Sequence, residues 1–313
     1  MSQLLLPEKV EFLINKLYEN VNTVICGKQN TVDKMLMALL AGGHVLLEDV
    51  PGLGKTLLAK TIAKSIDAKF RRVQCTPDLL PSDITGVSIF YPETREFKFI
   101  QGPIFTNVLL VDEINRAAPR TQSCLLEAME ESQITIEGTS QKLEKPFFVI
   151  ATQNPIEYHG TFDLPEAQLD RFLIVLGIGY PDQEEEDTII EFYLNNVYNN
   201  VEPVISLEDY LMLHECTRKV SVSKEIRKYV LDIINATRND TNIKLGASPR
   251  GTLALLRMAQ SSAILAGRNY VIPDDVKNVA VEVLSHRVIP THKRGLLVNN
   301  SIISELVKKI TVP

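Results

Sequence analysis

One short segment constrains the fold of this chain more than any other feature of its sequence: Gly52-Leu53-Gly54-Lys55-Thr56. It lies between an apolar run, Val45-Leu46-Leu47, and a helical pattern from Leu57 to Ser65. Glycines at such a turn let the backbone approach a ligand closely, and the N–H groups that open the helix attract an anion. The segment therefore predicts a strand, loop and helix that bind a polyphosphate, in which Lys55 reaches the β- and γ-phosphates and Thr56 binds magnesium.

One position departs from the strict spacing of this phosphate-binding motif. The motif has a glycine five positions before Gly54, and this chain has Asp49 there. A carboxylate at the mouth of the loop disfavours an anion unless it points away. The alternative is an ordinary strand-turn-helix with glycines at the turn, but Gly-x-Gly-Lys-Thr between a strand and a helix favours nucleotide binding.

A second apolar run, Val108 to Val111, ends in two acids, Asp112 and Glu113. In an enzyme with a phosphate-binding loop, the first acid helps to hold a magnesium ion and the second polarises the water that attacks the γ-phosphate. A solvated strand end is the alternative for any Asp-Glu pair, but so apolar a strand argues against it. We therefore predict Asp112 as a metal ligand and Glu113 as the catalytic acid-base group.

Three further polar residues lie at the ends of predicted elements: Asn154, Arg171 and Arg250. An amide after the run Phe147 to Ala151 could orient the water and sense the γ-phosphate, although an asparagine before proline is also typical of a turn. A guanidinium at either arginine could neutralise charge on the phosphates in the transition state. The alternative for the arginines is a local ion pair, such as Asp170 with Arg171.

Short β-rich apolar runs alternate with helical patterns from Gly43 to about Tyr180, and several of these runs are continuously apolar. Such runs are expected of strands covered on both faces, so the pattern predicts an α/β fold with a parallel sheet between helix layers. Two stretches interrupt the alternation, 77–102 and a predicted hairpin within 132–146, and we expect both to project from the sheet. The predicted strands are His44–Glu48, Phe70–Gln74, Asn107–Val111, Phe147–Ala151 and Phe172–Leu176.

The strand patterns stop at Tyr180-Pro181, and amphipathic helical patterns follow. Apolar residues recur at helical spacing from Ile226 to Ile234, which predicts a helix with one buried face. We therefore expect two domains: an α/β phosphate-loop domain over residues 1–180, with an N-terminal helix, and a smaller all-α domain over residues 181–313.

Composition and charge restrict the location and the partners of the chain. Its 313 residues carry 33 basic and 39 acidic side chains, and the net charge of −6 does not favour nucleic acid or an anionic membrane. The charge-free stretch Met35–Leu47 is shorter than the roughly 18 to 20 residues of a membrane-spanning helix, and the N-terminus lacks the order of a signal peptide. The four cysteines have no paired spacing, which indicates neither a disulfide framework nor a zinc site. We expect a soluble, cytoplasmic protein with reduced thiols and no membrane span.

Six motifs follow one another along nearly the whole chain: Gly52-Leu53-Gly54-Lys55-Thr56, Gln101-Gly102-Pro103-Ile104-Phe105, Val111-Asp112-Glu113-Ile114-Asn115-Arg116, Ala151-Thr152-Gln153-Asn154-Pro155, Leu164-Pro165-Glu166-Ala167-Gln168-Leu169-Asp170-Arg171-Phe172 and Gly246-Ala247-Ser248-Pro249-Arg250. This ordered set resembles the MoxR family of AAA+ ATPases. The resemblance implies the AAA+ fold, in which a phosphate-loop domain is followed by a helical lid. It also implies that the two inserted stretches are the helix-2 insert and the pre-sensor-1 hairpin of this branch.

The resemblance implies roles for single residues in the hydrolysis of ATP. Asn154 would be sensor 1, Arg171 an arginine finger offered to the neighbouring subunit and Arg250 sensor 2 from the lid. Arg116 and Arg120 are further candidates for contacts with the neighbour. Ile25 and Gly27 would contact ATP from a segment that family members place against adenine. Mg²⁺ would be held by Thr56 and by the Walker B residue Asp112, beside the catalytic Glu113. The residues of the Walker A segment that would contact ATP are Pro51, Gly52, Leu53, Gly54, Lys55, Thr56 and Leu57.

Family members form rings, commonly hexamers, and act as chaperone-like motors that mature or activate other proteins; the family name comes from methanol dehydrogenase maturation. The resemblance therefore implies a homo-oligomeric ring and a protein substrate with a von Willebrand factor A domain. One alternative is a nucleic-acid motor, which the acidic total charge and the small basic cluster at residues 292–294 disfavour. Another is a nucleotide-binding switch without hydrolysis, which the presence of Glu113, Asn154 and Arg171 disfavours.

Overall fold

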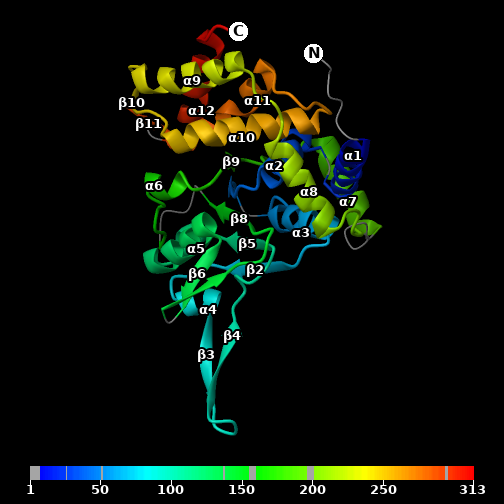
Figure 1. The fold of residues 1–313 in the computed structure, drawn as a ribbon, viewed down its shortest axis with the longest axis vertical. Coiled ribbons are helices and arrows are strands. Elements are labelled where there is room, and N and C mark those ends of the chain that lie inside the picture. The colour runs from blue at the N-terminus through cyan, green and yellow to red at the C-terminus, as the bar shows by residue number, and fades with distance from the viewer. Residues whose placement is uncertain are drawn as a thin grey trace.

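The structure is a computed structural model, and it describes residues 8–25, 27–50, 52–136, 138–154, 160–195, 201–292 and 295–313. Figure 1 shows helices of the C-terminal part at one end of the long axis, a sheet with its helices in the middle, and a long hairpin at the other end.

A five-stranded parallel sheet forms the centre of the N-terminal part, which confirms the predicted sheet. Its strands are β1 (Val45–Glu48), β2 (Phe70–Gln74), β5 (Val108–Asp112), β8 (Phe148–Gln153) and β9 (Ile174–Leu176). They lie in the order β2-β5-β8-β1-β9, and every pairing is parallel. The carboxyl ends of β1, β5 and β8 therefore meet at one edge, where ligands bind in sheets of this kind.

Alternate residues of the sheet strands pack into two separate cores. Val45 and Leu47 of β1 belong to one core together with side chains of α1, α2 and α3, whereas Leu46 belongs to the other together with side chains of α5. Helices therefore cover both faces of the sheet, as the continuously apolar strands predict. The helices of this part are α1 (Glu8–Asn22), α2 (Gln29–Ala41), α3 (Lys55–Ser65), α5 (Pro119–Glu131), the short α6 (Glu166–Leu169) and the 3-10 turn η1 (Ile114–Arg116).

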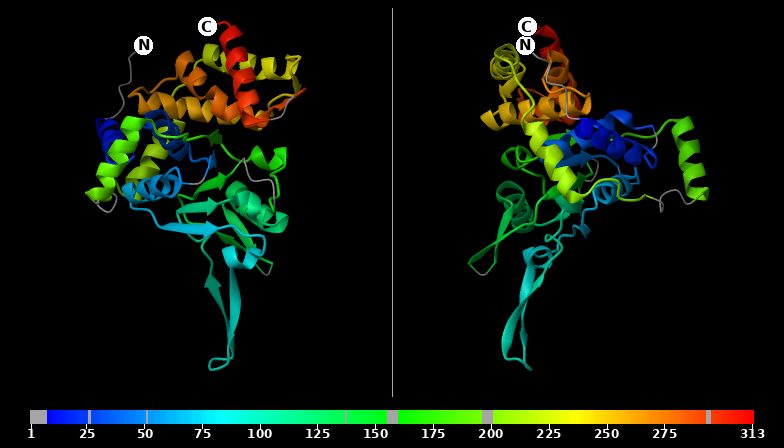
Figure 2. Two further views of the ribbon diagram at one scale, coloured as in Figure 1. Left: turned by 180° about the vertical axis from the view of Figure 1, so that it is seen from behind. Right: turned by 45° about the vertical axis from the view of Figure 1, so that its right-hand side comes forward.

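Two hairpins lie in the stretches where the sequence predicts insertions. The larger pairs β3 (Gly86–Tyr91) with β4 (Glu96–Gln101) after the short helix α4 (Pro81–Thr85), and it extends far from the body of the molecule (Figures 1 and 2). The smaller pairs β6 (Gln133–Ile136) with β7 (Thr139–Lys142).

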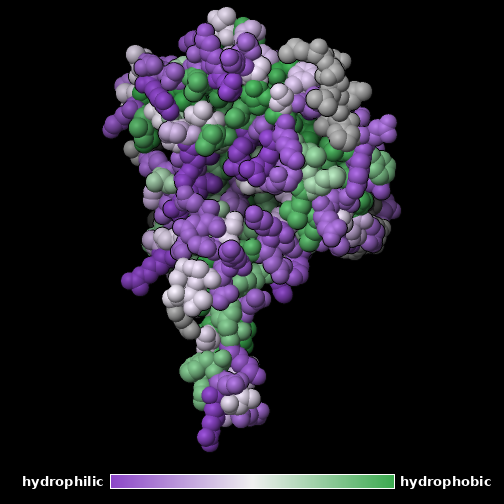
Figure 3. All heavy atoms as spheres, viewed as in Figure 1, coloured by the Kyte–Doolittle hydropathy of each residue, from purple (hydrophilic) through white to green (hydrophobic). Residues whose placement is uncertain are grey.

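The base of the larger hairpin requires glycine. Gly86 has a φ of 98°, and a Cβ on it would lie 2.2 Å from the carbonyl oxygen of Ile100 on the facing strand. Apolar side chains lie along the projecting strands, as Figure 3 shows, and Phe97 is 72% exposed.

The C-terminal part is helical and rests on the sheet domain. Helices α8 and α10 both pack against α2, so the two parts share one hydrophobic core. The predicted boundary at residue 180 falls between β9 and α7, and the helical part also contains a short antiparallel ribbon of β10 and β11 that the sequence did not predict. The elements of this part are α7 (Gln183–Leu194), α8 (Leu207–Arg218), α9 (Lys224–Asn239), β10 (Ile243–Leu245), α10 (Pro249–Leu265), α11 (Pro273–Leu284), η3 (Ser285–Arg287), β11 (Ile289–Pro290) and α12 (Leu296–Lys309).

Two absences can be stated for the part of the chain that the structure describes. None of its helices combines the length and the apolarity that crossing a membrane would require. Its three cysteines, Cys75, Cys124 and Cys216, are free thiols.

A buried histidine joins α2, α5 and the sheet. The N–H of Val149 donates to Nδ1 of His44 at 3.0 Å, so Nε2 carries the ring hydrogen and donates to the carbonyl oxygen of Met129 at 2.9 Å. The pKa of His44 is lowered from 6.5 to about 4, mainly by burial. The hydrogen bond to Met129 opposes this shift, and the charge of Arg257 contributes to it. The folded state therefore holds this ring neutral.

We expect acid to destabilise the fold through His44. The pKa is lower in the folded state than in the unfolded chain, so its contribution is complete above pH 6.5 and is lost as pH falls towards 4, by about 3 kcal/mol in total. Urea unfolding at pH 7 and at pH 4.5 measures this loss. The loss in free energy of unfolding should be smaller in His44→Gln, because glutamine cannot take up the proton. The matched control is His292→Gln, at an exposed position, and its loss should equal that of the wild type. Equal losses in His44→Gln and the wild type would contradict the assignment.

Candidate functional site

The predicted phosphate-binding loop joins β1 to α3. Gly52 and Gly54 have φ values of 90° and 78°, in the left-handed region that favours glycine, and α3 begins at Lys55. The ammonium of Lys55 donates to the carbonyl oxygen of Asp49 at 2.6 Å, across the loop. Of the residues predicted to contact nucleotide, Pro51 lies outside the described residues.

The carboxylate of Asp49 points away from the loop. Its Oδ2 accepts hydrogen bonds from the backbone N–H groups of Ile178 and Gly179, the latter at 2.8 Å. These two residues follow β9 and lead to α7, so the carboxylate ties the phosphate-binding loop to the connection between the two parts of the chain. At the position that departs from the strict motif, the carboxylate is therefore held by backbone donors outside the loop.

Asp112 ends β5 with both carboxylate oxygens engaged. The hydroxyl of Thr152 donates to Oδ1 at 3.0 Å, and Nε of Arg72 donates to Oδ2 at 2.6 Å. Arg72 lies on the neighbouring strand β2, and its side chain is half exposed. A cation therefore already sits at the acid that the sequence predicts as a metal ligand.

Glu113 follows in a strained backbone conformation. Its φ is 56°, in a region that non-glycine residues rarely adopt and that often marks functional sites. Its N–H donates to the hydroxyl of Thr152 at 2.9 Å, while its Oε2 accepts from Gln74 and pairs with Arg116, each at 3.1 Å. Thr152 thus fixes the position of both acids.

The predicted residues of three elements line one polar cavity of about 210 Å³. The loop and α3 supply Lys55 and Thr56, β5 ends in Asp112 and Glu113, and Asn154 follows β8. Asn154 is 7% exposed, so its amide lies within the site rather than at an open turn. The other lining residues are Asp49, Gly52, Gly54, Arg72, Gln74 and Thr152.

Charge in this cavity is balanced around Lys55. Burial lowers the pKa of the Lys55 ammonium, and the carboxylates of Asp49, Asp112 and Glu113 oppose this effect. Among the residues that the structure describes, no three His, Cys, Asp or Glu side chains form a protein-only metal cage. Mg²⁺ usually takes one or two protein ligands and completes its shell with phosphates and waters, so the oxygens of Thr56 and Asp112 fit this ion.

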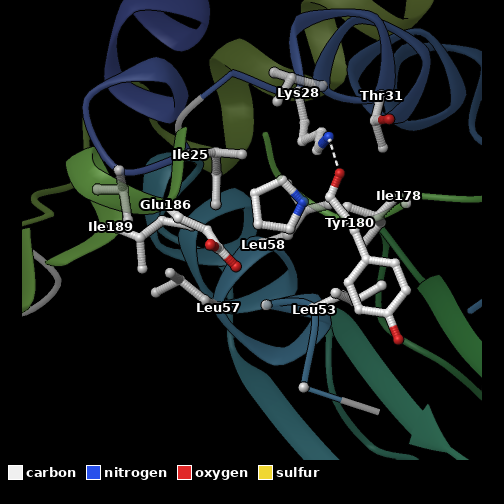
Figure 4. Close-up of a pocket in the computed structure, with 16 residues that line it drawn as sticks. Ile25, Lys28, Thr31, Leu53, Leu57, Leu58, Ile178, Tyr180, Glu186 and Ile189 are labelled. Atoms are coloured by element: carbon white, nitrogen blue, oxygen red, sulfur yellow. Dashed lines mark hydrogen bonds between the residues drawn. The ribbon is translucent and has the colours of Figure 1, made fainter. Parts of the chain in front are cut away.

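A second, mostly apolar cavity of about 520 Å³ lies on the other side of the loop, and its size suits a nucleoside. Figure 4 shows Ile25, Leu57 and Ile189 around it, from three parts of the chain. Gly52 and Gly54 line both cavities, so the loop separates a polar compartment from an apolar one.

Three of the residues predicted to contact the nucleotide line this apolar cavity: Ile25, Leu53 and Leu57. Gly27, predicted together with Ile25, is not among the lining residues. Gly27 has a φ of 72°, and a Cβ there would lie 2.0 Å from the carboxylate of Glu185. That carboxylate pairs with Lys28 at 3.0 Å, so Gly27 makes room for the ion pair that anchors the start of α7.

Arg171 and Arg250 lie together at a different place. Both pair with Glu130 at the end of α5, Arg171 through Nε at 3.0 Å. They line a cavity of about 310 Å³ that also contains Arg257 and Arg287, and neither arginine lines the cavity with Lys55. The arginines therefore form local ion pairs, which was the alternative to a role at the phosphates. The partner of Arg171 is Glu130, however, and not Asp170. Asp170 pairs with Arg287 at 2.7 Å instead.

Comparisons with known proteins agree with this geometry. A family model described as the ATPase family associated with various cellular activities (AAA) matches residues 44–174, and an AAA lid domain model matches residues 235–306. The chain is 42% identical to the chaperone MoxR1 of Mycobacterium tuberculosis, over 92% of this chain and 78% of that protein, and 31% identical to the protein MoxR of Paracoccus denitrificans, over 86% of each. The chain belongs to the MoxR family of AAA+ ATPases.

Two further proteins are similar to this MoxR-family member over nearly its whole length. YeaC of Bacillus subtilis is 47% identical over 98% of this chain and 97% of that protein. A crystal structure from Cytophaga hutchinsonii, assigned as an ATPase, superposes with a TM-score of 0.90 at 37% identity and covers 98% of this chain and 97% of that one. The expected AAA+ fold, a sheet domain followed by a helical lid, is confirmed.

The structure adds three residues to this MoxR-family site that sequence reasoning missed: Arg72, Gln74 and Thr152. Arg72 and Gln74 lie near the end of β2, and Thr152 lies on β8 between the strand core and Asn154. A signal existed for each, because each is polar and lies near the carboxyl end of a predicted strand, where the acids also lie.

Proposed function

We propose that the protein hydrolyses ATP in a magnesium-dependent reaction at the polar cavity. One observation carries the proposal: Lys55, Thr56, Asp112, Glu113 and Asn154 line a single cavity although separate elements supply them. The apolar cavity across the loop would take the adenosine, and the loop would hold the triphosphate. Phosphoryl transfer requires this combination of a cation, a helix N-terminus and a positioned water.

The side chains of the site have separate roles in this proposal. Lys55 holds the β- and γ-phosphates, Glu113 accepts the proton of the attacking water, and Asn154 orients that water. Thr56 and Asp112 would hold Mg²⁺, which neutralises phosphate charge when bound.

We also propose that the active unit is a ring, commonly a hexamer in this family. Arg171 and Arg250 lie away from the polar cavity of their own chain. A guanidinium that stabilises the transition state would therefore come from a second copy, which couples hydrolysis to assembly.

The proposed role of the ring is to mature or activate a partner protein in the cytoplasm. A relative from Mycobacterium tuberculosis is named a chaperone, and the free thiols of the described residues suit a reducing compartment. By family analogy the partner would carry a von Willebrand factor A domain. A pull-down with ATP-loaded Glu113→Gln protein tests this proposal.

Lys55→Ala tests the nucleotide site itself. Removing a charge-assisted hydrogen bond to phosphate costs about 1.5 to 3 kcal/mol, so ATP should bind roughly 10- to 100-fold more weakly. Titration with a fluorescent ATP analogue measures the dissociation constant. Lys60→Ala, on the exposed side of the same helix, is the matched control and should bind like the wild type. Unchanged affinity in Lys55→Ala would refute the proposed position of the phosphates.

A further inference from the structure

We propose that Glu130 is a positioning residue that holds Arg171 and Arg250 as one double-cation surface for the phosphates bound by a second copy of this chain. This inference rests on the proposed ATP hydrolysis in a ring. It assigns a role to Glu130, which is not among the residues that line the polar cavity. The ion pairs of Glu130 are with Arg171 and Arg250, which do not line that cavity either.

Each carboxylate oxygen of Glu130 holds one arginine. Oε2 contacts Nε of Arg171, and Oε1 contacts Nη2 of Arg250. A guanidinium has five N–H donors, so one carboxylate contact leaves donors on both arginines for a phosphate. Both arginine side chains remain accessible, with exposed fractions of 30% and 44%.

The backbones that carry the two arginines are already joined without Glu130. Arg171 follows Asp170, and Arg250 lies two residues after Ser248, whose hydroxyl donates to Asp170 Oδ2 at 2.9 Å. Arg287, which is almost fully buried, holds Asp170 from the other side at 2.7 Å. Glu130 is therefore required only for the orientation of the two side chains.

Charge explains why this orientation needs a carboxylate. Among the residues that the structure describes, four arginines line the cavity but only two acids do, Asp170 and Glu130. Arg287 is paired with Asp170, and Arg257 donates to the carbonyl oxygens of Ala41 and Gly42. Without Glu130, the guanidiniums of Arg171 and Arg250 would repel each other and separate, and a phosphate would meet one cation instead of two.

Glu130→Gln keeps the shape of the side chain and removes its charge. We expect the kcat of ATP hydrolysis to fall about tenfold or more, because small displacements of catalytic groups have effects of this size. The affinity for ATP should stay unchanged, because the residue lies outside the nucleotide cavities of its own chain. Glu131→Gln is the matched control: its carboxylate accepts from Gln133 at 2.8 Å, and kcat should equal that of the wild type.

Mixing distinguishes positioning from a general structural effect. Lys55→Ala copies bind ATP weakly but carry an intact Glu130 and both arginines, so adding them to Glu130→Gln copies should restore turnover. Rescue would also show that the Glu130→Gln copies are folded. The inference would be overturned if Glu130→Gln hydrolysed ATP at least as fast as the wild type, or if its turnover were low and the mixture showed no rescue. In either case, hydrolysis by the wild type would leave the proposed function intact. Absence of hydrolysis in the wild type would overturn both.

Discussion

Arg171→Ala is expected to lower the kcat of ATP hydrolysis by roughly 10³ to 10⁵, the range over which an arginine finger accelerates phosphoryl transfer. The physical reason is that charge spreads over the oxygens of the transferred phosphoryl group, and a guanidinium neutralises it there. Binding of ATP should change little, because Arg171 lies with Glu130 and not in the cavity with Lys55.

Phosphate release at saturating ATP measures this effect, and mixed assemblies locate the arginine. Arg171→Ala copies retain their nucleotide site, whereas Lys55→Ala copies retain their arginine. Together they should regain part of the activity, since each supplies what the other lacks. Failure to regain activity would assign Arg171 to its own chain or to no catalytic role. Arg227→Ala, at an exposed arginine of α9, is the control and should hydrolyse ATP like the wild type.

Glu113→Gln is expected to lower kcat by about 10² to 10⁴, the usual contribution of a general base, and to leave ATP bound. The amide cannot accept the proton of the attacking water. It can still accept the hydrogen bond from Gln74 and stay in contact with Arg116, so the site should keep its shape.

Single-turnover hydrolysis and equilibrium titration with ATP separate these two effects. Glu127→Gln, at an exposed position on α5, provides the control and should hydrolyse ATP like the wild type. Rapid turnover by Glu113→Gln would remove Glu113 from the role of general base.

Local sequence patterns predicted the elements of this fold closely. The predicted strand Phe70–Gln74 coincides with β2, and the other four sheet strands differ from the prediction by one or two residues at one or both ends. The reason is that strand burial depends on side chains within each segment. The two acids could be placed at the end of this strand for the same reason, since β5 is buried along its length and ends at Asp112.

Contacts between distant segments could not be predicted in this way. The orientation of Asp49 depends on two backbone N–H groups far along the chain, at Ile178 and Gly179. The pairing of Glu130 with Arg250 joins α5 to the first turn of α10 in the other part of the molecule. Nothing in the periodicity of either segment specifies its partner, because these contacts arise only when the lid packs on the sheet domain.

The central claim is that one Mg·ATP lies between Lys55 and Asp112, and a crystal structure of the Glu113→Gln protein with ATP and Mg²⁺ tests it most directly. We predict the β- and γ-phosphates within hydrogen-bonding distance of the Lys55 ammonium, with the ion bound by the hydroxyl of Thr56 and with Asp112 in its coordination or hydration shell. A triphosphate bound away from the loop would contradict this account. So would a triphosphate that contacts Lys55 while Asp112 stays paired with Arg72 and takes no part in holding the ion.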